Sequence, residues 1–228
     1  MMEQKPCTMA SGCGFRLTMK RVLKILLKCL RSKEDLIGNN NSLAAYRFQF
    51  GGKTMILETA RLILRDYTHE DFDAIFEILS DAETMQHYPK PYDAEMTKQW
   101  IEWNIKNYQK YGFGIWAVTL KETGEFIGDC GITIQNIDGE FLPEIGYHIH
   151  KRYWRQGFGS EAARAVRDWA FENTEYDCLY SYMKYTNVGS YSTAVANGMK
   201  KVKEYPDEKN KISYAYALTR EEWSLLER

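Results

Sequence analysis

The spacing of apolar positions predicts alternating strands and helices from Met55 onward. Short apolar or alternating runs are typical of strands, and apolar residues three or four positions apart are typical of helices. The predicted strands cover residues 61–65, 113–120, 126–134, 142–149, 178–183, 200–205 and 211–218. The predicted helices follow Thr68, Pro91 and Gly159, occupy 188–197, and close the chain after Thr219. This order predicts a mixed α/β sheet with helices packed on it.

Two of the predicted helices begin with capping signals. Thr68 is followed three residues later by Asp71, and Thr219 by Glu222, so each pair can satisfy backbone N–H groups reciprocally. Helical spacing assigns one face to each of the first two helices: Phe72, Ile75, Phe76 and Leu79 in the first, and Met96, Trp100, Trp103 and Asn107 in the second. Asp138-Gly139 marks a turn between two of the central strands.

The first 54 residues differ from the rest in charge and composition. They carry 10 Lys and Arg against 3 Asp and Glu, which leaves 20 against 28 for residues 55–228. Within them, Met19 to Arg31 has the pattern of a basic amphipathic helix, which could lie on a membrane or bind a partner. We expect a basic N-terminal extension at 1–54, either weakly structured or arising from a mis-assigned start, and a catalytic domain at 55–228.

Composition excludes several classes of protein. No stretch reaches 18 apolar residues, so no membrane span is expected. The five cysteines are odd in number and widely spaced, with no metal-ligand pattern and no secretory signal, so we expect no metal and a cytoplasmic location. The basic segment lacks interleaved aromatics, so nucleic acid is not an expected partner.

The segment from Glu144 to Ala162 has the layout of an anion site. It reads as a strand, a basic aromatic turn and a loop with Gly157 and Gly159 that opens a helix. Glycines let the backbone approach a phosphate closely, and the free N–H groups of the first helical turn point toward the anion. The third glycine of a Rossmann fingerprint is absent, because position 162 is alanine, and no P-loop Gly-Lys-Ser/Thr follows.

This segment resembles motif A of the GNAT superfamily of N-acetyltransferases, in the variant of the RimJ/RimL-like branch. Three other segments resemble the same branch in the right order: 58–65 its opening strand, 112–128 its central hairpin, and 187–199 its last motif. The resemblance covers about Met55 to Leu218. It implies a twisted, mostly antiparallel sheet with helices on both faces, in which strands 142–149 and 178–183 splay apart.

The resemblance also implies acetyl-CoA as co-substrate and assigns cofactor-binding residues. The pyrophosphate would lie on backbone amides of the loop and helix start: Arg155, Gln156, Gly157, Phe158, Gly159 and Ser160. The pantetheine arm would pair with the strand backbone at Tyr147, His148 and Ile149. Asn187 and Ser190 would lie at the mouth of the cleft, against pantetheine and thiol.

The chemistry requires a base, because an alkylammonium ion with a pKa of about 10.4 is almost wholly protonated at neutral pH. Glu144 is the first choice, since strand alternation puts it on one face with Gly146 and His148. There are two alternatives. Glu144 could be a solvated residue at the strand end while a water chain takes the proton, or His148 could be the base. Many GNAT enzymes place a tyrosine acid seven residues after Asn187, where this chain has Ala194.

The missing tyrosine leaves the general acid open. Ser190 or Tyr191 could take its place, or the thiolate could leave without an acid. Cys130 and Cys178 are expected to be small core residues, because nothing beside them supplies an activating base.

The function expected is transfer of an acetyl group from acetyl-CoA to a primary amine by direct attack in a ternary complex. The acceptor would be a protein N-terminus or a small amine, and the enzyme a monomer or homodimer. The alternative is a non-catalytic acyl-CoA-binding regulatory module, for which Ala194 is the only hint. A purely structural role would leave the four cofactor-site signatures without a purpose.

Overall fold

The computed structural model describes residues 48–50 and 53–226, with side chains from Ile56 onward. The helix expected over Met19–Arg31 lies outside the described residues. The compact unit begins at Arg47, and its strand β2 begins at Lys53. The domain boundary expected at Met55 therefore falls inside β2, a strand that the apolar pattern alone did not reveal.

The elements follow the predicted order, with two additional strands at the start. The strands are β1 (Phe48–Phe50), β2 (Lys53–Glu58), β3 (Leu62–Arg65), β4 (Ile115–Leu120), β5 (Phe126–Ile137), β6 (Glu140–Ile149), β7 (Cys178–Lys184), β8 (Lys200–Asp207) and β9 (Lys211–Thr219). The helices are α2 (Phe72–Leu79), α3 (Ala94–Tyr111), α4 (Phe158–Asn173), α5 (Val188–Ala196) and α6 (Arg220–Ser224), with 3-10 turns η1 (His69–Asp71) and η2 (Lys151–Tyr153). Both predicted capping boxes are present, at Thr68 and Thr219.

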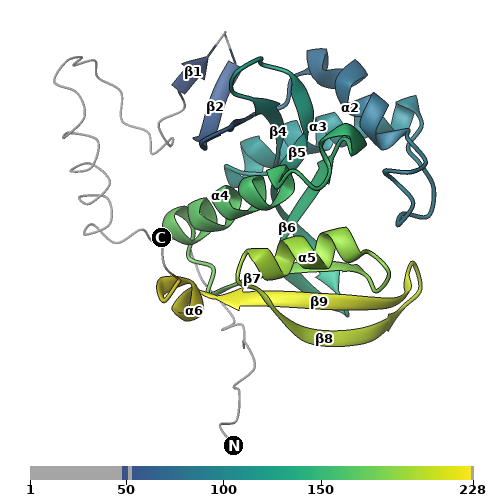
Figure 1. Ribbon diagram of the computed structural model, residues 1–228, viewed down its shortest axis with the longest axis vertical. Coiled ribbons are helices and arrows are strands. Elements are labelled where there is room, and N and C mark those ends of the chain that lie inside the picture. Colours follow the sequence, from purple (N-terminus) through teal and green to yellow (C-terminus); the bar gives the residue numbers. More distant parts are fainter. Residues whose placement is uncertain (1–47, 51–52, 227–228) are drawn as a thin grey trace, which may run out of the picture. The chain divides into compact units, whose positions relative to one another are not determined.

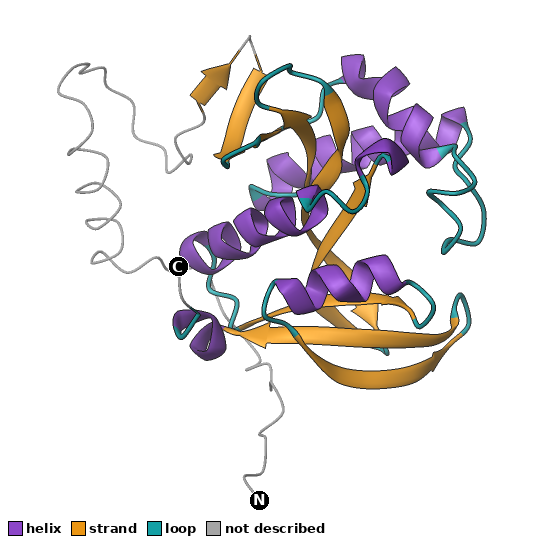
Figure 2. Ribbon diagram, in the orientation of Figure 1, coloured by secondary structure: helices purple, strands orange, loops and turns teal. Residues whose placement is uncertain are grey.

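The described strands form one sheet in the order β1-β2-β3-β4-β5-β6-β7-β9-β8 (Figure 1). Every neighbouring pair is antiparallel except β6 and β7. Helices flank this sheet, as the colouring by secondary structure shows (Figure 2). The mixed, mostly antiparallel sheet expected from the sequence is confirmed.

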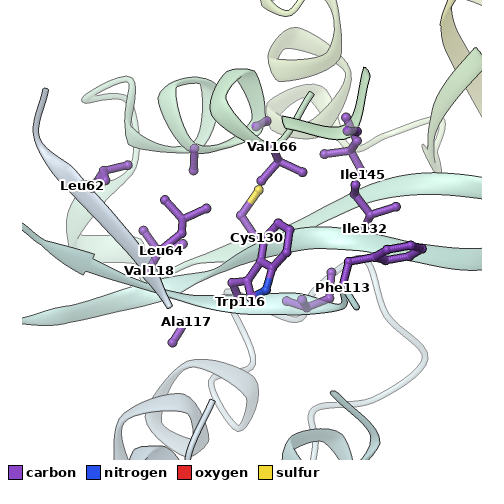
Figure 3. Packing of buried hydrophobic residues seen from close by; sticks show 14 of the residues in the cluster. Leu62, Leu64, Phe113, Trp116, Ala117, Val118, Cys130, Ile132, Ile145 and Val166 are labelled. Atoms are coloured by element: carbon purple, nitrogen blue, oxygen red, sulfur yellow. The ribbon is translucent and has the colours of Figure 1, made fainter. Parts of the chain in front are cut away.

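Neighbouring residues of β5 point to opposite faces of the sheet. Cys130 is fully buried in the apolar layer that includes Val166 of α4 (Figure 3). Asp129 faces the other way and contacts Trp100 of α3. Helices α2 and α3 therefore cover one face and α4 the other.

The buried face of α3 differs from the one expected. The core side chains are Thr97, Ile101, Asn104 and Tyr108, whereas Trp103 is 37% exposed. Asn104 is buried because its amide is satisfied: Oδ1 accepts from the N–H of Ile115 at 2.9 Å, and Nδ2 donates to the carbonyl of Trp100 at 3.0 Å. Apolar spacing cannot indicate a polar residue that is buried through its hydrogen bonds.

Candidate active site

The sheet opens between β6 and β7. Strand β6 pairs with β5 over its whole length, from Glu140 to Ile149, but it has a single paired position with β7, Glu144 opposite Tyr180. Beyond Glu144 the two parallel strands separate. The expected splay between strands 142–149 and 178–183 is thus present, and it begins at the residue chosen as the candidate base.

The backbone of β6 offers hydrogen-bonding groups to this opening. The carbonyl of Ile145 accepts from Ser181 of β7 at 3.2 Å, and that of Ile149 from the Trp154 indole at 2.6 Å. Alternate residues of a strand point the same way, so the N–H and C=O of Tyr147 also face away from β5. An extended chain placed in the opening would meet the N–H and C=O of Tyr147 as it would meet a neighbouring strand.

The face of the β5–β6 ladder toward α3 carries the candidate acid–base groups. Three successive cross-strand pairs lie on it: Thr133 with Glu144, Gly131 with Gly146, and Asp129 with His148. Without a side chain at Gly146, the Glu144 carboxylate lies over the strand, with Oε2 3.0 Å from where a Cβ would stand. The small residue gives the carboxylate its position.

Glu144 has the properties of a base poised near neutral pH. It is only 9% exposed, and among the described residues its one hydrogen bond is donated by the Thr133 hydroxyl, at 3.2 Å. Burial raises the pKa of Glu144 to about 7, against smaller opposing effects of Thr133 and His148. A general base is most effective when its pKa lies near the working pH.

Asp129 is fully buried and accepts four hydrogen bonds. Oδ1 accepts from the backbone N–H of His148 at 3.0 Å and lies 2.8 Å from its Nδ1. Oδ2 accepts from the Tyr67 hydroxyl at 2.8 Å and the Trp100 indole at 3.0 Å. Both oxygens are engaged, so this carboxylate is fixed in place, and Glu144 is the freer acceptor of the two.

His148 connects Asp129 to the α2–α3 loop. Its Nε2 lies 2.7 Å from the hydroxyl of Tyr88, and its ring contacts those of Tyr88 and Trp100. Burial disfavours the charged imidazole, but the carboxylates of Asp129 and Glu144 together hold the pKa of His148 above its ordinary value. His148 was expected as a cofactor-binding residue or second base, and its side chain lies on the α3 face beside Glu144.

The opposite face of β6 leads to α5. The Tyr147 hydroxyl donates to the carbonyl of Ser190 at 2.8 Å and lies 3.2 Å from its Oγ. Asn187 caps α5 by accepting from the N–H of Ser190 at 3.1 Å. Tyr191 stacks on Tyr216 of β9. Of the side chains considered for the acid, the Ser190 hydroxyl is therefore the one beside Tyr147.

The loop from β6 to α4 leaves a helix N-terminus open. Arg155 and Gly157 have φ of +59° and +81°, in the left-handed region that glycine adopts most readily. Gly157 is the N-cap of α4, and no side chain caps the helix. The N–H groups of Phe158, Gly159 and Ser160, in the first turn, lack intrahelical acceptors by geometry. This end of α4 favours a negatively charged group.

An ion pair holds the helix start in place. Arg61 lies 2.7 Å from Glu161 of the first turn, donates to the carbonyl of Gln156 at 3.1 Å, and covers the ring of Phe158 at 4.1 Å. Glu161 also accepts from the Thr59 hydroxyl at 2.6 Å. The Arg61 side chain is 45% exposed, so its ion pair with Glu161 adds little to the free energy of folding. Its main effect is to hold the loop in its conformation.

The chain has been compared with known proteins. The family model of the GNAT acetyltransferase domain matches residues 61–200. The chain belongs to the GNAT acetyltransferase family. The matching model is that of the RimJ/RimL-like branch. Its members use acetyl-CoA, and this protein is an acetyl-CoA-dependent N-acetyltransferase of that family.

Individual relatives agree with this. The uncharacterized protein YkkB of Bacillus subtilis is 35% identical over 144 residues, which are 63% of this chain and 84% of YkkB. The structure of an acetyltransferase from Agrobacterium tumefaciens is 28% identical with a TM-score of 0.63, covering 79% of this chain and 99% of that one. RimL, a ribosomal L7/L12 alpha-N-protein acetyltransferase, matches with a TM-score of 0.63 over 76% of this chain and 99% of its own. At 17% identity it shows the fold alone.

Other sequence expectations concern cysteine, metal and membrane. Cys130 and Cys178 are buried, and burial raises the pKa of the Cys130 thiol well above its ordinary value, as suits a core residue. In the part of the chain that the structure describes, no three His, Cys, Asp or Glu side chains are grouped to hold a metal ion. No helix there is long and apolar enough to cross a bilayer.

Sequence reasoning did not find Asp129 or the contact of Tyr88 with His148. A signal for the former was present, because Asp138-Gly139 is a turn with φ of +51° and +88° between β5 and β6. A two-residue turn fixes the register of a hairpin. Counting back from it places Asp129 opposite His148 and Thr133 opposite Glu144. Tyr88 lies in a loop, and no local pattern indicates its contact with a residue 60 positions away.

Proposed function

We propose that this acetyltransferase transfers the acetyl group to a primary amine by direct attack within a ternary complex, with Glu144 as the general base. The observation that carries the proposal is the position of Glu144. Its buried carboxylate has a pKa of about 7 and lies where β6 and β7 begin to separate. An amine held there could lose its proton to Glu144 and attack a thioester placed in the opening.

The cofactor side of the proposal rests on two features. The start of α4 presents the amides of Phe158, Gly159 and Ser160 to a pyrophosphate, beside the loop residues Arg155, Gln156 and Gly157. Of the residues expected to pair with pantetheine, Tyr147 has its backbone N–H and C=O turned toward the opening, where they could pair with this arm. The N–H of His148 is instead bonded to Asp129 of β5, and the carbonyl of Ile149 accepts from the Trp154 indole. Unpaired strand N–H groups there could also donate to the developing oxyanion.

The leaving thiolate has one hydroxyl in the expected region. Ser190 lies beside Tyr147, and Asn187 fixes the turn that carries it. Ala194 is 2% exposed and packs in the core, so no side chain replaces the tyrosine of other GNAT enzymes at that position. We propose that Ser190 stabilises the thiolate and that Asn187 acts by holding the helix start.

The acceptor belongs to one of two classes, a protein N-terminus or a small amine. Two buried carboxylates, Asp129 and Glu144, face the same side of the sheet as the aromatic rings of Tyr88 and Trp100. Carboxylates and aromatic faces together favour a cation. Both classes offer one, and RimL, a ribosomal L7/L12 alpha-N-protein acetyltransferase, is an example of the first.

The proposal is tested by measuring thiol release from acetyl-CoA with panels of peptides and small amines. Transfer to at least one amine, with Glu144→Gln impaired, would support it. A protein that binds acetyl-CoA but acetylates no acceptor would instead indicate the regulatory binding module.

The catalytic domain is proposed to begin close to Arg47, where the compact unit begins, with a basic extension before it. The pairing of β1 with β2 and of β2 with β3 supports this start over Met55.

A further inference from the structure

Three side chains from separate elements form a hydrogen-bonded chain on the face of β6 that carries Glu144. Asp129 lies 2.8 Å from Nδ1 of His148, and Nε2 of His148 lies 2.7 Å from the hydroxyl of Tyr88. Asp129 is fully buried, the side chain of His148 is 9% exposed, and Tyr88 is 42% exposed. The chain of contacts therefore leads from the core to a tyrosine that is partly exposed at the surface.

The contacts of Asp129 define which nitrogen of His148 carries the proton. An ionised carboxylate only accepts, so the neutral imidazole places its proton on Nδ1 and leaves Nε2 as an acceptor. Nε2 then accepts from the Tyr88 hydroxyl, and the lone pairs of that hydroxyl oxygen stay available to another donor. Tyr67 and Trp100 hold the second oxygen of Asp129 and so prevent the carboxylate from turning.

Acetyl transfer to an ammonium ion must release one proton. The ammonium has three N–H protons and the amide product of a primary amine keeps one. Of the two that leave, one ends on the CoA thiol and the other must reach the solvent. Glu144, which is proposed to take the first proton, is only 9% exposed and needs a way to pass it on.

We propose that Asp129, His148 and Tyr88 form the proton exit of the active site, with Asp129 as a positioning residue; this rests on the proposed role of Glu144. No hydrogen bond of the described residues joins Glu144 to Tyr88, so a water molecule would carry the proton between them. As the oxygen of Tyr88 receives this proton, the phenolic proton moves to Nε2 of His148, whose imidazolium is paired with Asp129. When that proton returns to Tyr88, the oxygen releases one to a water molecule that reaches it along the exposed part of the residue. Each group ends in its starting state.

The electrostatics agree with transfer along this chain. Burial opposes the imidazolium of His148, but Asp129 and Glu144 raise its pKa above the ordinary value. Removal of the Tyr88 hydroxyl from water, and then the charge of Glu144, raise the pKa of Tyr88, so it stays protonated between transfers. The other titratable groups around the chain are Tyr67, Tyr92, Tyr108, Cys130 and Tyr182.

The first test is Tyr88→Phe, which removes the hydroxyl but keeps the ring against His148. With any accepted amine, kcat in weak buffer should fall by about 10²-fold, the lower end of what a positioned acid–base group contributes. Added imidazole should restore most of it, because a small base can carry the proton instead. Tyr111→Phe, at a tyrosine of similar exposure (45%), should change neither kcat nor the effect of imidazole.

An unchanged kcat in Tyr88→Phe would overturn the exit. So would a loss that imidazole does not restore, or one confined to the KM of the amine, since Tyr88 would then act by binding the acceptor. In each of these three cases Glu144→Gln would remain impaired and the proposed function would stand.

A second measurement is independent of turnover. In an NMR titration, Asp129→Asn should lower the pKa of His148 by roughly one to three units, the usual range for loss of a contacting opposite charge. An unshifted His148 would show that Asp129 does not position and stabilise the imidazolium, and the proposal would fail whatever the activity.

Discussion

Replacing Glu144 by Gln keeps the side chain's shape and its contact with Thr133, but it removes the proton acceptor. With a pKa of about 7, Glu144 is about half ionised at pH 7, one tenth at pH 6 and nine tenths at pH 8. Turnover of the wild-type enzyme should therefore rise with pH and level off above about 7. In Glu144→Gln it should fall by about 10²–10⁴-fold near neutral pH, with acetyl-CoA affinity little changed.

The pH dependence separates this from other causes of lost activity. An alkylamine with a pKa of about 10.4 has roughly 4 in 10⁴ molecules neutral at pH 7 and about 4 in 10² at pH 9. The variant can use only these neutral molecules, so its rate should rise about tenfold per pH unit. Because the wild-type rate only doubles over the same range, the deficit of the variant should shrink about 50-fold between pH 7 and 9. Glu140→Gln, the same change at an exposed position of the same strand, should leave the profile unchanged.

The folding stability of Glu144→Gln is a second measurement, and it should change in the opposite direction from turnover. Folding raises the pKa of Glu144 from its unfolded value of 4.5 to about 7. Its contribution to folding stability is therefore fully present below pH 4.5 and is lost as the pH rises through about 7. The ionised carboxylate then costs about 3 kcal/mol at pH 8, at 1.4 kcal/mol per pKa unit. Glu144→Gln should thus melt higher than wild type at pH 8 and alike at pH 4. A variant with an unchanged pH–rate profile would refute Glu144 as the base and favour His148 or a water chain.

Three other changes test the remaining parts of the site. Gly159→Asp should abolish acetyl-CoA binding in calorimetric titration, whereas Gly159→Ala should still bind. A Cβ at this position meets Ile149 at an ordinary 3.6 Å, so only the charge of the aspartate opposes a phosphate. Equal affinities of the two variants would contradict phosphate binding by this loop. Gly146→Ala puts a Cβ 3.0 Å from Oε2 of Glu144, so turnover should fall with little change in melting temperature, and full activity would show that the carboxylate's position is unimportant. A chain starting at Arg47 should melt like the full-length protein in calorimetry and one starting at Met55 should melt lower, since β2 begins at Lys53; equal melting would restore the boundary at Met55.

Local signals in the sequence predicted the elements well because their causes are local. Each capping box joins residues that are three positions apart, Thr68 with Asp71 and Thr219 with Glu222. Both boxes form in the structure. The glycine-spaced loop before α4 is likewise contained in a few residues. The resemblance to the GNAT family then supplied the mostly antiparallel pairing and the splay, which the spacing of apolar residues could not.

What the sequence did not reveal depends on contacts between distant segments. Asn104 is in the core because it bonds to Ile115, and Tyr88 faces the site because its hydroxyl bonds to His148. Strand β2 was missed because its pairing partners, β1 and β3, define it more than its own pattern does. In each case a hydrogen-bond partner far along the chain decides the position, and periodicity carries no information about partners.

The pKa of the acceptor decides how much the enzyme needs Glu144, and this links the base to the open question of the acceptor class. A protein α-amine, with a pKa of about 7.7–8.0, has roughly one molecule in ten neutral at pH 7, whereas an alkylamine has fewer than one in a thousand. Loss of the base should therefore impair transfer to an alkylamine far more than transfer to a peptide N-terminus. A buried carboxylate of pKa about 7 serves both, but only an alkylamine makes it indispensable. The ratio of wild-type to Glu144→Gln turnover at pH 7, compared across accepted substrates, thus reports which kind of amine this site is built to deprotonate.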